Sequence, residues 1–346
     1  MADDHESDRV RSIITFPMLL QHTLRIHLSN NLREDITRIL DKDLLVIFEE
    51  HWLKSEPDEI EVMTFIKLLW DVRYCFDKYV IKWVEQEDEE VHAIRRLRIN
   101  DSDSGSSLSR ENSDSQVGFA LLQSMLYHSQ QMTTQYWITP LLNYLLVDKS
   151  KNPFVYLKYI DNQLLCSGDD DPLIVRTRRF LKKPRWGEYK PVVSSDLSKD
   201  LGTKFPHYWF YKLEFILWDQ LKNKKGGKWK RFRMTAKNSV EHISPQKPEI
   251  FDSNKVDGEL LNSFGNLALV SRSINSEYSN KPYAEKRARF IEKNRNKLDS
   301  LKMALIYENE QWNNDLVKKH QAKMINRFHK YFTSVEDEID KFRKEE

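Results

Sequence analysis

The chain contains little cysteine, glycine or proline, and each shortage excludes a class of protein. Two cysteines in 346 residues, Cys75 and Cys166, cannot form a disulfide framework or a four-thiolate zinc site. This shortage favours a reducing compartment, and we expect a cytoplasmic protein. Nine glycines and 11 prolines are too few for a turn-dense all-β sandwich, so long helices are expected.

The sequence also lacks a long apolar run. The strongest run, residues 136–147, contains Thr139, Pro140 and Asn143 and is shorter than the ~20 residues that a membrane-spanning helix needs. The first eight residues are acidic and have no apolar core, which is unlike a signal peptide. We therefore expect no membrane association.

No sign of charge dominates, because 55 Lys and Arg oppose 53 Asp and Glu. A polyanionic partner must then be bound by a local basic surface rather than by the net charge. Residues 222–233 (KNKKGGKWKRFR) carry seven basic side chains, with Trp229 and Phe232 between them. This run could follow a phosphate backbone, or it could be a solvated hairpin.

Composition divides the chain into four parts. Residues 1–100 are expected to be helical, and the clearest helix spans residues 59–84, with apolar residues at steps of three and four. We expect its core face to lie along the periodic residues Ile60, Met63, Ile66, Leu69 or Trp70, Cys75 or Phe76, Tyr79 or Val80, and Trp83, with Cys75 buried. Residues 101–117 are rich in Ser and Asp and are predicted to be a linker or mobile loop. A second helical region, 118–200, and a C-terminal domain, 201–346, follow.

The pattern changes within the C-terminal domain. A helix with a buried aromatic face is expected at 204–221, and two short strands are expected at 240–243 and 267–270. Ser271 or Ser273 should cap the next helix, and polar helices are expected at 284–297 and 301–343. The fold class is thus mainly α, with a small local α+β element.

Three short motifs surround these strands. His242 opens a His-x-x-Pro sequence, which alone is a weak signal. The second motif is Gly265-Asn266-Leu267-Ala268-Leu269, and Asn275 follows Asn266 by nine positions. A strand asparagine followed nine residues later by a helix asparagine is the second half of an HNH signature.

These motifs resemble the HNH, or ββα-metal, nucleases, and more closely the C-terminal domain of GmrSD-type type IV restriction endonucleases. The matching positions are Glu241 to Gln246, Gly265 to Ser271, Asn275, and Glu285-Lys286-Arg287. The resemblance covers residues 204–292, about a quarter of the chain. It implies that a helical body carries a small C-terminal ββα-metal element.

One part of that family has no counterpart here. Its members usually begin with a ParB-like domain marked by Asp-Gly-Gln-Gln-Arg, which this sequence does not contain. Nucleotide dependence and sensing of modified bases therefore do not carry over. We expect recognition to come from a separate ParB-like subunit or from a lost segment.

The resemblance assigns roles that the chemistry supports. Hydrolysis of a phosphodiester needs a general base near neutral pH, and His242 is the natural candidate. Glu241 and Asn275 match the metal-ligand positions, and their hard oxygen atoms suit Mg²⁺ or Mn²⁺. Asn266, grouped with His242 as catalytic, would brace the loop and aim the histidine ring at water.

Basic residues around the motifs are candidate contacts to nucleic acid. They are Arg272, Lys286, Lys228, Lys230 and Arg231. Charged residues on helices are more often simply solvated.

The sequence therefore predicts a metal-dependent HNH endonuclease that hydrolyses DNA in restriction or anti-phage defence. Cleavage would leave 5′-phosphate and 3′-hydroxyl ends. Two alternatives stay open: a non-catalytic nucleic-acid-binding or regulatory subunit of a defence complex, and an HNH nuclease that acts on RNA. Basic residues would contact nucleic acid in all three cases, so they do not distinguish between these functions.

Overall fold

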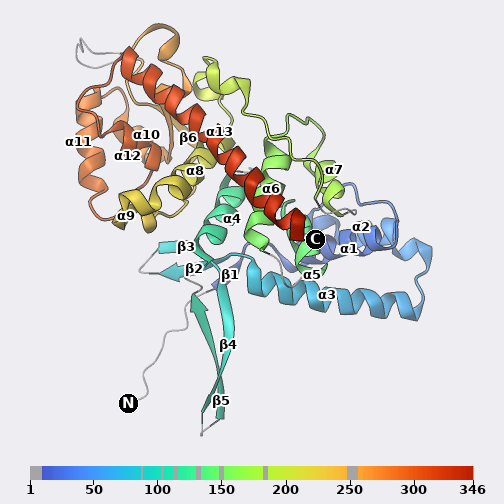
Figure 1. Ribbon diagram of the computed structural model, residues 1–346. Helices are drawn as coiled ribbons and strands as arrows, with labels where there is room; N and C mark the ends of the chain where they lie inside the picture. The colour runs from blue at the N-terminus through green and yellow to red at the C-terminus, as the bar shows by residue number, and fades with distance from the viewer. Residues whose placement is uncertain are drawn as a thin grey trace. The chain divides into compact units, whose positions relative to one another are not determined.

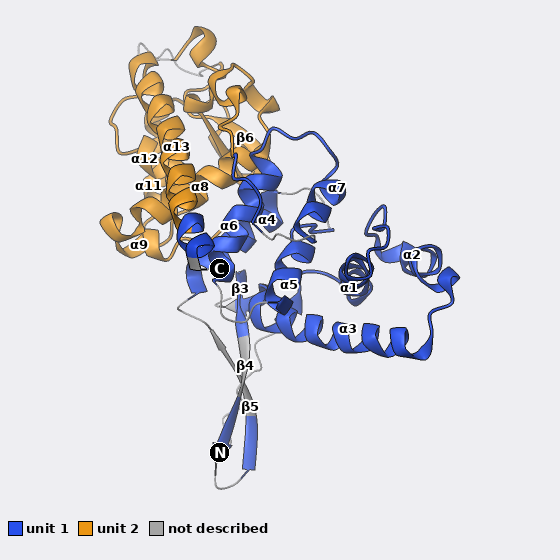
Figure 2. Ribbon diagram, turned by 45° about the vertical axis from the view of Figure 1, so that its right-hand side comes forward, with its two compact units in different colours: residues 1–190, 339–346 blue, residues 191–338 orange. Residues whose placement is uncertain are grey.

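The computed structural model describes residues 10–86, 89–102, 105–112, 116–129, 134–147, 152–181, 186–247 and 256–345. Over these ranges the chain is mainly helical, as predicted (Figure 1). It forms two compact units, one of residues 1–190 with 339–346 and one of residues 191–338 (Figure 2). The second unit begins at Pro191 rather than at the expected position 201. No helix in the described part of the chain combines the length and apolarity needed to cross a membrane.

Unit 1 is a set of helices with two small antiparallel sheets. Its helices are α1 (Phe16–Asn30), α2 (Leu44–His51), α3 (Glu59–Tyr79), α4 (Val117–Ser129), α5 (Ile138–Val147), α6 (Pro153–Leu165) and α7 (Leu173–Arg178). Its strands are β1 (Val10–Ser12), β2 (Lys82–Gln86), β3 (Glu89–Ala93), β4 (Arg95–Ser102) and β5 (Gly105–Asn112). The sheet order is β1-β2-β3, while β4 and β5 form a separate hairpin.

Two expectations for this region were wrong. The helix that starts at Glu59 ends at Tyr79, and Val80 already has an extended backbone conformation. The strands β2, β3 and β4 therefore follow where helix was expected. The described residues of the predicted 101–117 linker belong to β4, β5 and α4. The backbone groups of the two strands pair across the hairpin from Arg95↔Asn112 to Ser102↔Gly105.

Only part of the predicted core face of α3 is buried. Ile60 and Trp70 are each 77% exposed, whereas Phe76 is buried as predicted, together with Phe65 and Val72. Helix α3 carries two apolar stripes, and its packing against α1 and α5 buries the one that contains Phe65, Val72 and Phe76. Cys75 is buried, as expected.

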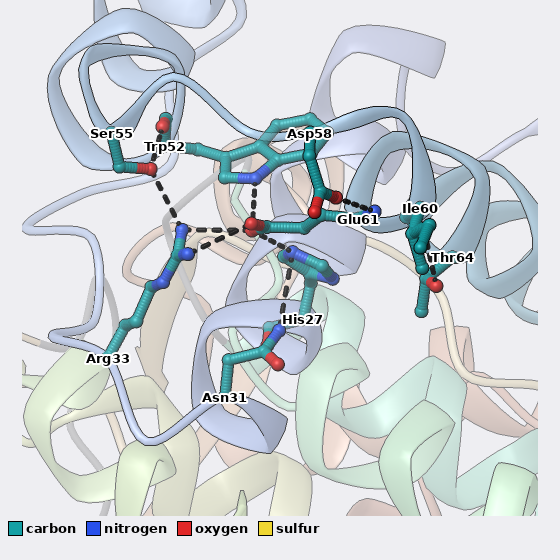
Figure 3. A network of polar contacts seen from close by, with 9 residues as sticks. All are labelled: His27, Asn31, Arg33, Trp52, Ser55, Asp58, Ile60, Glu61 and Thr64. Carbon is teal, nitrogen blue, oxygen red and sulfur yellow. Dashed lines mark hydrogen bonds and ion pairs between the residues drawn. The ribbon is translucent and has the colours of Figure 1, made fainter.

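A network of polar contacts connects α1, α3 and the segment between them (Figure 3). The Glu61 carboxylate accepts hydrogen bonds from His27 Nε2 at 3.2 Å, Trp52 Nε1 at 2.7 Å and Arg33 Nη2 at 3.0 Å. Burial alone would raise the pKa of Glu61, but these hydrogen bonds and the Arg33 charge hold the pKa below its usual value. Through Arg33 and Trp52, the network attaches the segment between α1 and α3 to Glu61 on α3, which also contacts His27 on α1.

Unit 2 contains a two-stranded sheet surrounded by helices. Its elements are α8 (His207–Lys225), α9 (Gly227–Lys230), β6 (Ser239–His242), β7 (Leu267–Val270), α10 (Arg272–Tyr278), α11 (Tyr283–Lys293), α12 (Leu301–Ile306) and most of α13 (Asn314–Glu345). Strands β6 and β7 are antiparallel and lie where two strands were predicted, and Ser271 caps α10 through a hydrogen bond to Ile274 N. The expected single helix 301–343 is instead two helices, α12 and α13.

Helix α8 supplies the apolar support for this sheet. Its residues Phe215, Ile216 and Leu217 are fully buried, and α8 packs on β7 while α10 packs on β6. The small sheet is therefore covered by helices, with the end of β6 and the loop before β7 left to form a site.

The two stripes of α3 give a direct test of the packing. Phe76→Ala should lower the free energy of unfolding by about 3–5 kcal/mol, because it empties a buried position. Trp70→Ala should change it by no more than ~0.5 kcal/mol, because that side chain is exposed. Denaturant unfolding of the two variants measures both values, and a larger loss from Trp70→Ala would mean that the exposed stripe is covered in solution.

The Glu61 network predicts a pH-dependent contribution to stability. Because its folded-state pKa lies below the ordinary 4.5, Glu61 stabilises the fold above that value and loses this contribution as the pH falls through the folded pKa. Glu61→Gln should lower the free energy of unfolding near neutral pH by about 1–3 kcal/mol. The difference from wild type should shrink in acid, and an unchanged difference at low pH would contradict this account.

Candidate active site

The candidate site lies at the end of β6, where the chain bends at Ile243 and Ser244 before the loop that leads to β7. The register pairs His242 with Leu267 and Glu241 with Ala268, and Ile243 N continues the ladder by donating to Asn266 O at 2.8 Å. The sequence therefore brings the His-x-x-Pro and Gly-Asn-Leu motifs side by side, as the two short apolar runs predicted.

Asn266 holds the two ends of the loop together. Its side chain is fully buried; Oδ1 accepts from Ser244 N and Trp312 Nε1, both at 3.0 Å. Its Nδ2 donates to Leu261 O at 2.8 Å and Ser244 O at 3.2 Å. An amide side chain suits this buried position, because its oxygen accepts two hydrogen bonds and its NH₂ group donates two.

Gly265 precedes this asparagine for a steric reason. A Cβ atom there would lie 2.8 Å from Val317 O and 3.0 Å from the Gln321 side chain on α13. The backbone N–H of Gly265 donates to Gln321 Oε1 at 3.0 Å. Only glycine lets this backbone approach α13 so closely.

A buried lysine holds the same segment through two hydrogen bonds. Lys302 on α12 donates through Nζ to Phe264 O at 2.5 Å and to Leu267 O at 2.6 Å. Burial lowers the pKa of Lys302 to about 7, against the opposing charge of Glu214. Sequence reasoning did not find Lys302, because a lysine on a helix is usually read as solvated.

His242 is held by a residue that the motifs did not reveal. Its ring is only 8% exposed, and Nε2 lies 2.9 Å from Asn262 Oδ1. An amide oxygen can only accept, so in this arrangement Nε2 carries the proton and Nδ1 keeps its lone pair. Burial lowers the pKa of His242, the Asn262 contact opposes that shift, and Lys286 adds to it.

Asn262 is itself fixed by its neighbours. Gly202, at φ +53°, would place a Cβ atom 3.2 Å from Asn262 Oδ1, and its backbone N–H donates to Asn262 O at 3.0 Å. Gln246 Nε2 donates to the same Asn262 Oδ1 at 3.2 Å. No periodicity or motif marks Asn262 in the sequence; only the fold identifies it.

Glu241 forms an ion pair with Lys286 on α11. Its Oε1 lies 2.5 Å from Lys286 Nζ, and the same ammonium group donates to His242 O at 2.7 Å. Burial raises the pKa of Glu241 and lowers that of Lys286, while the charge of each opposes the shift of the other. The short contact and the burial of both side chains describe an ion pair.

Asn275 lies on α10, the helix that packs on β6. The side chain is half-buried, and no hydrogen bond to its amide is found among the described residues. Glu241 and Asn275 thus offer a carboxylate and an amide oxygen from adjacent elements. Carboxylate and amide oxygens are the hard ligands that Mg²⁺ or Mn²⁺ takes together with water.

No denser cluster of ligands exists in the described ranges. Nowhere in them do three or more His, Cys, Asp and Glu side chains gather as a metal site would need. A divalent ion at Glu241 would therefore have few protein ligands. Glu241 itself already contacts Lys286.

The predicted nucleic-acid contacts divide into three kinds. Arg272, Lys230 and Arg231 are exposed. Lys228 is half-buried and donates to Asn294 O at 2.8 Å. Lys286 is fully buried, so its prediction as a phosphate contact was wrong: its ammonium group faces β6 instead of solvent.

Residues 222–233 form neither a hairpin nor a surface of exposed aromatic rings on which bases could stack. It forms the end of α8 and the short helix α9, and both Trp229 and Phe232 are buried. These aromatic rings pack inward and cannot stack on bases.

Gly265 provides a test of how the site is supported. Gly265→Ala should push the loop away from α13 and lower the free energy of unfolding of this unit by about 1–3 kcal/mol. Gly258→Ala is a control for glycine replacement itself, because open space surrounds that position although its φ of +59° adds strain. Thermal unfolding compares the two variants, and a smaller loss at Gly265 than at Gly258 would contradict the close packing.

Comparison with known proteins adds one finding. Residues 195–327 match the family described as GmrSD restriction endonucleases, C-terminal domain. No curated protein and no solved structure matches the chain. The matched segment lies within the unit of residues 191–338 and contains His242, Asn266 and Asn275. The resemblance drawn from the sequence motifs is therefore confirmed: this segment is similar to the C-terminal domain of the GmrSD restriction endonucleases.

Proposed function

We propose that the unit of residues 191–338 is a metal-dependent HNH endonuclease that hydrolyses DNA phosphodiester bonds in restriction or anti-phage defence. The family match supports an endonuclease of the restriction type. The single observation that carries the finer proposal is the geometry of His242, a mostly buried imidazole that Asn262 fixes through Nε2. That arrangement prepares Nδ1 to accept a proton.

The first step of the proposed reaction is proton removal from water by His242 Nδ1. Asn262 keeps the proton on Nε2 and fixes the plane of the ring, so that the lone pair of Nδ1 has one direction. Asn266 holds the backbone of residues 243–244 through its hydrogen bonds to Ser244. The histidine therefore enters the reaction neutral and oriented.

Glu241 and Asn275 are the residues that would hold Mg²⁺ or Mn²⁺. When bound, such an ion polarises the scissile phosphate and stabilises negative charge on the departing 3′ oxygen. The exposed side chains of Arg272, Lys230 and Arg231 supply positive charge for the phosphate backbone of the substrate. Cleavage in this way leaves 5′-phosphate and 3′-hydroxyl ends.

Target recognition is a separate question from cleavage. We propose that a distinct subunit, of the ParB-like kind found in related proteins, directs this nuclease to its DNA. The alternatives are an RNA substrate and a non-catalytic binding subunit, and the same experiment separates all three.

The test incubates the full chain with supercoiled plasmid, phage DNA carrying modified bases and structured RNA, each with Mg²⁺, Mn²⁺ or EDTA. We expect DNA cleavage that EDTA abolishes and that His242→Ala slows by at least about 100-fold, since a general base contributes ~10²–10⁴. His329→Ala, an exposed histidine on α13, is the matched control and should cut like wild type.

Other outcomes assign the alternatives. Cleavage of RNA alone would change the substrate and leave the site assignment in place. A folded wild type that binds DNA but cuts no substrate, with or without a ParB-like partner, would replace the nuclease with a binding subunit. Cutting that survives in His242→Ala would contradict the role of that histidine.

A further inference from the structure

Lys286 is the most unusual charged residue of the candidate site. Its side chain is fully buried, and its ammonium group donates to two atoms at the end of β6: Glu241 Oε1 at 2.5 Å and His242 O at 2.7 Å. One ammonium group thus contacts two consecutive residues, the proposed metal ligand and the proposed general base.

Helix α11 leaves Lys286 little freedom to turn away. Tyr283 and Phe290, three residues before and four residues after Lys286, lie on the same buried face. Tyr283 Oη donates to carbonyl groups of Ile306 and Asn309, and Phe290 belongs to the hydrophobic core of the unit. The ammonium group is therefore a fixed charge, unlike a lysine that swings in solvent.

A fixed positive charge at Glu241 has two opposing effects on a divalent cation. It stabilises the buried carboxylate in its ionised form when no ion is present, because an unpaired buried charge is costly. It also repels any cation that binds the same carboxylate, since charges a few ångströms apart interact strongly in a buried setting.

We propose that Lys286 is the resident counter-ion of Glu241 and that a divalent cation has to share this carboxylate with it. This inference rests on the proposed function, because it takes Glu241 as a metal ligand. Lys286 keeps the site folded and Glu241 aimed without the ion, and it keeps the affinity for the free ion low. Tight ion binding then requires extra negative charge, which the phosphate of a bound substrate supplies.

The experiment measures Mn²⁺ binding to the full chain by isothermal titration calorimetry, together with the melting temperature with and without Mn²⁺. Lys286→Met should melt at a lower temperature than wild type without the ion, and it should bind Mn²⁺ at least about tenfold more tightly. The rise in melting temperature caused by Mn²⁺ should be larger in Lys286→Met than in wild type.

Matched variants separate charge from packing. Lys293→Met removes an exposed lysine of the same helix and should leave Mn²⁺ affinity unchanged. Lys286→Gln removes the charge but retains a hydrogen-bond donor, so it provides the same affinity test if Lys286→Met does not fold. Glu241→Gln should abolish Mn²⁺ binding in either background.

The outcomes distinguish this proposal from the proposed function. Binding that is lost in Glu241→Gln but unchanged or weaker in both Lys286 variants overturns the role of Lys286 and retains Glu241 as a ligand. No Mn²⁺ binding to wild type or to either Lys286 variant overturns both the metal assignment and this proposal. Tighter binding to the Lys286 variants, dependent on Glu241, supports it.

Discussion

The arrangement of the site depends on the fully satisfied side chain of Asn266. Four hydrogen bonds from one buried amide join the segment after β6, the loop before β7 and Trp312 near the start of α13. Without those bonds, the backbone N–H and C=O of Ser244 would be buried without these partners, which is costly. The position of His242, two residues before Ser244, follows from this constraint.

Buried charge is the second feature that organises the unit. Lys302 holds the backbone on both sides of Asn266, and Lys286 holds the backbone and the carboxylate at the end of β6. The Lys302 ammonium group donates to two carbonyl oxygens, and that of Lys286 to one carbonyl oxygen and one carboxylate oxygen. These contacts offset the cost of burying a lysine. The two lysines thus hold the ends of β6 and β7 from two different helices, α11 and α12.

The sequence alone predicted those features that depend on residues close together in the chain. Asn266 and Asn275 were identified from their spacing, and the strands around them from short apolar runs, because each signal lies within a few residues of its structure. The resemblance to the GmrSD C-terminal domain followed from the same residues. The catalytic and metal-binding roles stay predictions.

The rest depended on contacts between residues far apart in the sequence. Helix α3 has two apolar stripes, and only its tertiary partners decide that Phe76 rather than Trp70 is buried. Asn262 is an ordinary loop asparagine until the fold brings it to His242. Lys286 was read as basic and solvated, although its spacing from Tyr283 and Phe290 places it on the apolar face of α11 and could have indicated burial.

The central claim is that Asn262 holds His242 with the proton on Nε2 and the lone pair on Nδ1. The most direct measurement is a long-range ¹H–¹⁵N NMR correlation of the histidine rings near neutral pH, with the His242 signals assigned by their loss in His242→Ala. The account predicts a protonated, pyrrole-type Nε2 and an unprotonated, pyridine-type Nδ1 for His242, and a mixture of tautomers in Asn262→Ala. A proton on Nδ1 in the wild type would contradict it.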